Sequence, residues 1–239
     1  MNSYYVADES MDPRLLRNRA HPQLVHILNK EYCDLMIERN GNFSIESSKA
    51  LSSIQKDLFS HFDFDFKGKM DYKGAQDYMD VWPKFRGCFG VINERIKTIF
   101  EELNISKEEY ILHPIDIEGC CEMYYIMFVY QIPITNIVLK KSVYCHSFHP
   151  EVEYKLNNHN QYYDGEFECI IPKHLVIGKE FSNYDIIRIQ SCSDTFFSER
   201  LVHKIMENNV IGLQFYPSGR HAYDKMPFLS NTIPSLSFE

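Results

Sequence analysis

Hydrophobic residues recur along this chain with two periods, one typical of helices and one of strands. The most regular helical stripe is Ile92, Ile96, Ile99 and Leu103, which fall at i, i+4, i+7 and i+11. It predicts an amphipathic helix that ends near Asn104. Two other stripes have the helical period: Leu51, Ile54 and Leu58, and Phe197, Leu201 and Ile205.

Strand periods dominate the second half of the chain. Residues 124–130 are apolar at successive positions, which predicts a central strand covered on both faces. Residues 185–190 predict another strand, followed by Asp194 as the cap of the helix with the third stripe. Asn208 and Asn209 end that helix, and residues 211–216 alternate as a half-buried strand. Earlier in the chain, alternation on either side of Asn40 and Gly41 predicts a hairpin.

These elements predict an α+β fold with a mixed, mostly antiparallel sheet and helices packed on it. The N-terminal half is expected to be more helical and the C-terminal half richer in strands. We therefore divide the chain into a helix-rich region, 1–105, and a sheet-rich region, 106–239, or else one continuous domain.

Composition narrows the partners and the compartment. Twenty-five basic and thirty-three acidic residues give a formal charge of −8, which repels nucleic acid and anionic membranes and suits a basic protein partner. Seven cysteines with no CxxC pair indicate free thiols rather than a disulfide framework or a zinc ribbon. The first ten residues lack the basic and apolar regions of a secretory signal, and residues 123–130 are too short to span a membrane. We expect a cytoplasmic protein.

One segment, residues 61–80, interleaves aspartates with aromatic residues and is expected to be irregular and to lie on the surface. A hard cation at Asp63, Asp65 and Asp71 is the weaker interpretation, because the alternate positions hold phenylalanine rather than the Gly, Asn and Ser of metal loops. Exposed aromatic side chains beside carboxylates are typical of protein interfaces. The predicted partner-binding residues are Asp63, Asp65, Asp71, Tyr72, Asp77, Tyr78, Asp80 and Trp82.

The sequence gives little support to the hypothesis of an enzyme. Asp164, Glu166, Glu168 and Lys173 lie close enough in sequence for a metal-dependent nuclease, but two carboxylates on one strand face are usual on a solvated sheet. Cys145 lies next to His146 and near His149, but adjacent residues of a strand point to opposite faces and no second cysteine pair completes a zinc site. We predict no catalytic residues, no metal and no cofactor.

Three segments of the C-terminal third are laid out as a strand, a helix opening and a closing strand: 185–189 (DIIRI), 191–201 (SCSDTFFSERL) and 209–215 (NVIGLQF). This layout resembles cytosolic bacterial immunity proteins that accompany polymorphic toxins and type VI secretion effectors. Trp82-Pro83 before a helix and Tyr124-Tyr125 opening the apolar strand fit the same pattern. The resemblance implies neutralisation of one cognate toxin by direct binding. It transfers no functional residue, since toxin-binding positions differ between such proteins.

The leading hypothesis is a cytoplasmic immunity protein that binds and occludes a toxin domain, for example a nuclease. The chain itself would carry out no catalysis. A metal-dependent nuclease or hydrolase built on Glu166 and its neighbours is the first alternative. A scaffolding protein with another partner is the second. The sequence leaves the oligomeric state open.

Overall fold

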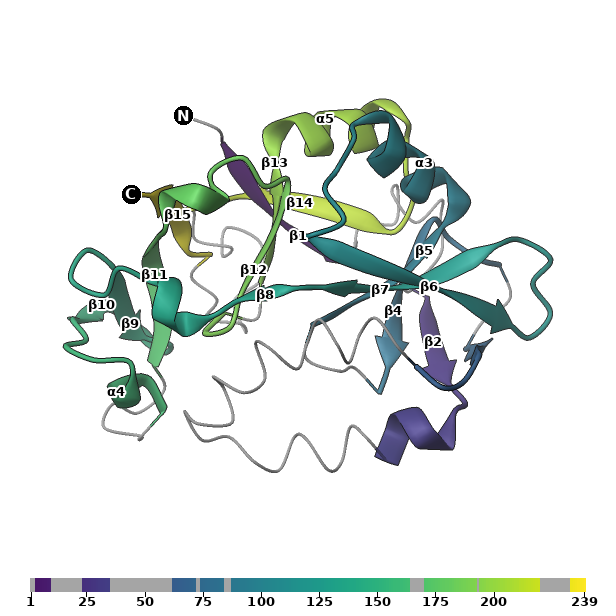
Figure 1. Ribbon diagram of the computed structural model, residues 1–239, viewed down its shortest axis with the longest axis horizontal. Helices are drawn as coiled ribbons and strands as arrows, with labels where there is room; N and C mark the ends of the chain where they lie inside the picture. Colours follow the sequence, from purple (N-terminus) through teal and green to yellow (C-terminus); the bar gives the residue numbers. More distant parts are fainter. Residues whose placement is uncertain are drawn as a thin grey trace.

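The computed structural model describes residues 3–9, 23–34, 62–71, 74–83, 87–163, 170–192, 194–219 and 233–239. Within them, strands outnumber helices and form a closed barrel and two further sheets (Figure 1). The predicted hairpin around Asn40 and the helical stripe at 51–58 lie outside the described residues.

Six strands close the barrel in the order β2-β3-β6-β7-β5-β4. Their bounds are β2 Leu24–Ile27, β3 Phe66–Met70, β4 Tyr78–Trp82, β5 Cys88–Asn93, β6 Tyr110–Ile117 and β7 Tyr124–Val129. Closure depends on two parallel pairs, β2 with β4 and β3 with β6, which join segments far apart in the sequence. The barrel interior is filled by alternate side chains of every strand, Val25, Phe66 and Ile126 among them.

Strand β7 confirms the prediction of a strand covered on both faces. All six of its residues are buried. Tyr124, Ile126 and Phe128 point into the barrel, whereas Tyr125 and Met127 join the core outside it. A strand that is hydrophobic on both faces is stable here because the barrel fills one face and the helices cover the other.

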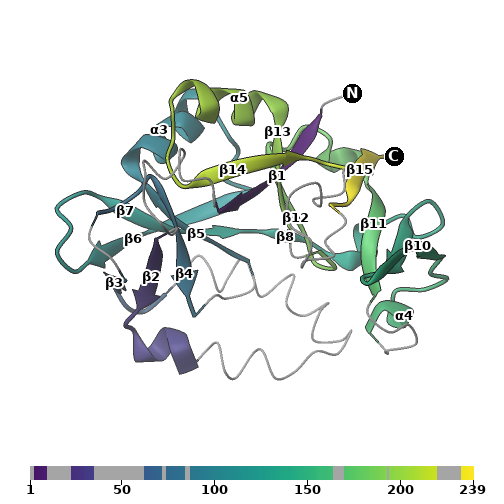
Figure 2. The ribbon, with the colours of Figure 1, turned by 180° about the vertical axis from the view of Figure 1, so that it is seen from behind.

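A five-stranded sheet, β14-β1-β13-β12-β8, lies beside the barrel (Figures 1 and 2). Its bounds are β1 Tyr4–Glu9, β8 Gln131–Ile132, β12 Ile186–Ile189, β13 Thr195–Ser198 and β14 Leu213–Pro217. A four-stranded sheet follows, with β9 Val143–His146, β10 His149–Tyr154, β11 Ile170–Ile177 and β15 Ser235–Phe238. The two sheets share a core around Tyr144, Leu175 and Phe196.

Two helices, α3 Glu94–Glu102 and α5 Glu199–Glu207, lie side by side in both views and contact β5, β13 and β1 (Figures 1 and 2). They confirm the first and third helical stripes. Their caps are Asn93 and Ser198, whose side chains accept the N–H groups of Ile96 and Leu201. Asp194 as the cap is wrong, because strand β13 lies between it and the helix.

The shorter helical elements are residues 30–34, η1 Ile134–Asn136, α4 Asn160–Tyr163 and η2 Lys179–Phe181. None of the helices in the described ranges is long and apolar enough to cross a membrane.

The predicted fold class is wrong. The described chain is mostly β, with a closed barrel and two other sheets, rather than helices packed on one mixed sheet. Periodicity identifies a strand but not its partner, so the pairing that closes the barrel left no pattern in the sequence. Barrel strands come from both sides of residue 105, and the domain division there stays a prediction.

Candidate partner-binding face

The predicted partner-binding residues occupy very different environments. Asp63, Asp65 and Asp71 are exposed, Asp80 is half-buried, and Asp77 and Tyr78 are buried. Trp82 is 60% exposed, and Tyr72 lies outside the described residues. The expectation of an irregular surface segment is wrong for Phe66–Met70 and Tyr78–Trp82, which are barrel strands.

Strand β3 separates the exposed aspartates into two groups. Asp65 precedes the strand and Asp71 follows it, so six residue steps at about 3.3 Å place them roughly 20 Å apart. On the Asp63 side, Phe62 and Phe64 pack against the barrel core. The aspartates therefore do not form one acidic patch.

Asp77 and Tyr78 hold the fold together. One Asp77 carboxylate oxygen accepts the Asn93 side-chain amide at 2.7 Å, and the other accepts the Ile211 N–H at 2.7 Å. The Tyr78 hydroxyl donates to the Phe89 carbonyl at 3.0 Å, and its ring lies in the core between barrel and helices. Both side chains are buried by other parts of the fold and are not on the surface.

Asp71, Asp80 and Trp82 meet on the outside of the barrel, around strand β2. Val25 and Val81 are fully buried and point inward, so alternation directs His26 and Trp82 outward. His26 is the Cα partner of Trp82 on one side and of Lys69 on the other.

Leu24 occupies the neighbouring row of the same surface. It is the Cα partner of Asp80, and its carbonyl accepts the Asp71 N–H at 3.1 Å. We call this surface the outer barrel face. It consists of Leu24, His26, Leu28, Lys67, Lys69, Asp71, Asp80 and Trp82.

Leu28 belongs to this face and was missed from the sequence. It is 48% exposed, and its N–H donates to the Lys67 carbonyl at 2.9 Å, continuing the ladder between β2 and β3. The signal was present as the alternation of residues 24–28, in which Val25 and Ile27 are buried and their neighbours are not. Without knowledge of the barrel, that short run did not indicate a strand.

Charges on the outer barrel face are mixed rather than acidic. The Asp71 carboxylate bonds His26 Nε2 at 2.6 Å. Lys67 and Lys69 are exposed and form no ion pair with any residue of the described ranges. The two lysines therefore offset the carboxylates, which the overall charge of −8 did not reveal.

A scan against protein-family models found no match, and neither did a search of curated proteins. The function is therefore inferred from the residues and their arrangement.

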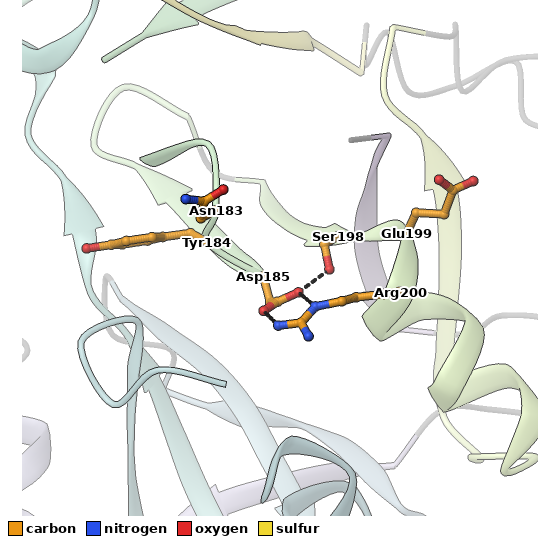
Figure 3. A pocket seen from close by; sticks show the side chains of 6 residues that line it. All are labelled: Asn183, Tyr184, Asp185, Ser198, Glu199 and Arg200. Atoms are coloured by element: carbon orange, nitrogen blue, oxygen red, sulfur yellow. Dashed lines mark hydrogen bonds and ion pairs between the residues drawn. The ribbon is translucent and has the colours of Figure 1, made fainter. Parts of the chain in front are cut away.

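A second candidate is a pocket of about 370 Å³ at the start of helix α5 (Figure 3). Its lining residues are Asn183, Tyr184, Asp185, Ser198, Glu199 and Arg200. The buried Asp185 carboxylate accepts the Ser198 hydroxyl and two nitrogens of Arg200, with Nε at 2.7 Å. Because Arg200 holds this carboxylate, Asp185 is poorly placed to act as a base toward Ser198. The cluster fixes the first turn of α5 to β12.

The structure describes only some of the groups considered for catalysis, and those do not come together in one site. Asp164, Glu166 and Glu168 lie outside the described residues, and Lys173 Nζ pairs with Glu153 at 2.6 Å. Cys145 is buried, whereas His146 and His149 lie at the β9–β10 turn with ring centroids 5.1 Å apart. Among the residues that the structure describes, no three His, Cys, Asp or Glu side chains could hold a metal ion together.

Glu109 behind the pocket predicts a pH dependence of stability. Its carboxylate is buried and accepts the N–H groups of Asp185 and Ile186 at 2.9 and 2.8 Å. Burial raises the pKa of Glu109 to about 7, and the nearby Asp185 carboxylate adds to the rise. A carboxyl whose pKa is higher in the folded chain stabilises it below the unfolded value of 4.5, and this stability is lost as the pH rises through 7.

We expect Glu109→Gln to flatten this dependence, because glutamine keeps an oxygen for the two N–H groups and cannot ionise. Between pH 6 and pH 8 the wild type should lose on the order of 1 kcal/mol of unfolding free energy relative to the variant. Urea unfolding of both proteins at several pH values measures the difference. Parallel pH profiles would show that Glu109 does not titrate in this range.

Proposed function

We propose that this chain is a cytoplasmic bacterial immunity protein that neutralises a cognate toxin domain by direct, stoichiometric binding. The observation that carries the proposal is Trp82, the only tryptophan of the chain, which is 60% exposed on a barrel strand. A large aromatic side chain left in water is costly unless a partner covers it, and tryptophan is the residue most enriched at interface hot spots.

The surroundings of Trp82 support the same role. His26, Asp71 and Asp80 surround the apolar groups with polar side chains, as the rim of an interface does. Such a surface acts by covering part of the toxin rather than by chemistry. The C-terminal segments that resemble immunity proteins form β12, β13, α5 and β14. These elements share a core with the outer side of barrel strands β4, β5 and β7.

A cytoplasmic location is part of the proposal. The cysteines of the described ranges are free thiols, namely Cys33, Cys88, Cys120, Cys121, Cys145 and Cys192. Free thiols persist in a reducing compartment, where the toxin would be met.

The test uses the toxin domain encoded beside the gene of this chain. The purified domain should bind the chain one to one, and co-expression should relieve its toxicity. Trp82→Ala should weaken the affinity about 30-fold or more, because truncating a central aromatic anchor typically costs 2 kcal/mol or more. Isothermal titration calorimetry measures the affinity of the wild type and of the variant for the toxin domain.

Met206→Ala is the matched control, since Met206 is 62% exposed on helix α5 and lies away from the barrel strands. Its affinity should stay within twofold of the wild type. Absence of binding by the wild type would refute the proposed function and favour a scaffolding role. Equal losses for both variants would show a general effect on folding instead.

A further inference from the structure

The outer barrel face has a regular order that follows from strand register. Strands β2 and β3 pair antiparallel, so Lys67, Lys69 and Asp71 lie opposite Leu28, His26 and Leu24 respectively. Strand β4 runs parallel to β2, which puts Trp82 beside His26 and Asp80 beside Leu24. Three rows result, spaced about 7 Å apart along the strands.

Charge divides along these rows. The Leu24 row carries a carboxylate on each side, Asp71 and Asp80. The other two rows carry the ammonium groups of Lys69 and Lys67 on their β3 side. One end of the face is therefore acidic, and the part next to the exposed leucine is basic.

The exposed apolar groups lie in the basic part. Leu28 is diagonal to Trp82 on neighbouring strands, which separates their Cα atoms by about 8 Å. At that spacing one apolar side chain of a partner can contact both. Both residues are among the most exposed large hydrophobic residues of the described ranges.

From this order we infer the chemistry of the partner. The toxin presents an apolar side chain that covers Leu28 and Trp82 and an acidic group that faces Lys67 and Lys69. This inference rests on the proposed function and refines it. A uniformly basic toxin surface, which the charge of −8 suggests, would place cations against two lysines that have no ion-pair partner in the described ranges.

The state of Asp71 strengthens the assignment. Its carboxylate lies 2.6 Å from His26 Nε2, on the β3 side of His26, whereas Trp82 is on the β4 side. A partner cation would have to compete with this contact. The charged contact with the toxin is therefore assigned to Lys67 and Lys69, which form no ion pair within the described ranges.

The test is titration of the same toxin domain with variants of the outer barrel face, using the fluorescence of Trp82, the single tryptophan. Leu28→Ala should weaken binding about tenfold. The double variant Lys67→Glu with Lys69→Glu should weaken it about tenfold, mainly through slower association. Lys140→Glu, a charge reversal at an exposed lysine between β8 and β9, should change affinity by less than twofold.

The outcomes separate the two proposals. Tighter binding by the double lysine variant, or unchanged binding by Leu28→Ala, would overturn this inference while the immunity function stands. Failure of the wild type to bind would overturn both. Self-association of the wild type that Trp82→Ala abolishes would instead make a second copy the occupant of the face, and light scattering detects it.

Discussion

Asp77→Ala is expected to lower the free energy of unfolding by about 3 kcal/mol. The Asp77 carboxylate is the acceptor for the Asn93 amide and for the Ile211 N–H, both at 2.7 Å. Alanine would leave these two donors without their partner in a buried site, and each unsatisfied group costs about 1–3 kcal/mol. Arg95, 3.5 Å from the carboxylate, would lose this ion pair and keep only its hydrogen bond to the Asn208 carbonyl. Urea unfolding followed by circular dichroism measures the loss.

Asp63→Ala is the control for this prediction. Asp63 is exposed and precedes β3, so its replacement should change stability by less than 0.5 kcal/mol, as is usual on a surface. If Asp77→Ala were as stable as the wild type, the carboxylate would not hold β4 to the α5–β14 connection. If Asp77→Ala weakened toxin binding without changing stability, Asp77 would be a contact residue of the interface.

Gly212→Ala is expected to cost about 4 kcal/mol, the largest effect of a single substitution proposed for this chain. Gly212 has φ +101°, and a Cβ there would lie 2.2 Å from the Tyr78 carbonyl oxygen. The added methyl group would meet backbone of the barrel strand β4, which has little freedom to move. Backbone strain and the clash therefore add. Thermal unfolding by calorimetry would show a large fall in the transition temperature.

Gly119→Ala separates the two contributions. Gly119 also has a positive φ, +75°, but a Cβ there would meet nothing within 4 Å. Only the backbone strain remains, at about 1 kcal/mol. Equal losses for the two variants would mean that the close approach of Gly212 to Tyr78 does not exist in solution.

Local patterns predicted individual elements well where the side chains that set the pattern also set the packing. The stripe through Ile96 and Ile99 became α3, and the one through Leu201 and Ile205 became α5. The helix limits were less certain because Ile92 and Phe197 belong to the preceding strands. A residue just before a cap can continue the apolar period without being helical.

The candidate face was predictable only in part. Trp82 and Asp80 were identified from an acidic and aromatic composition, and the structure places both on the outer barrel face. The same composition also selected Asp77 and Tyr78, which are buried. Composition does not report what the rest of the fold covers. Tyr78 lies on the same side of β4 as Asp80 and Trp82, but the core between the barrel and the helices buries it. Leu28 and the two lysines entered only through pairing with β2.

The sequence by itself determined the helices α3 and α5, the doubly buried strand β7 and the net charge of the chain. These are local or summed properties, which period and composition carry directly. The tertiary structure alone decided that six strands close a barrel and that Trp82 lies in a row with His26 and Lys69. Strand pairing is a contact between distant segments, and many pairings satisfy the same alternation. The order of charges around Trp82, on which the partner depends, therefore appears only when the barrel is closed.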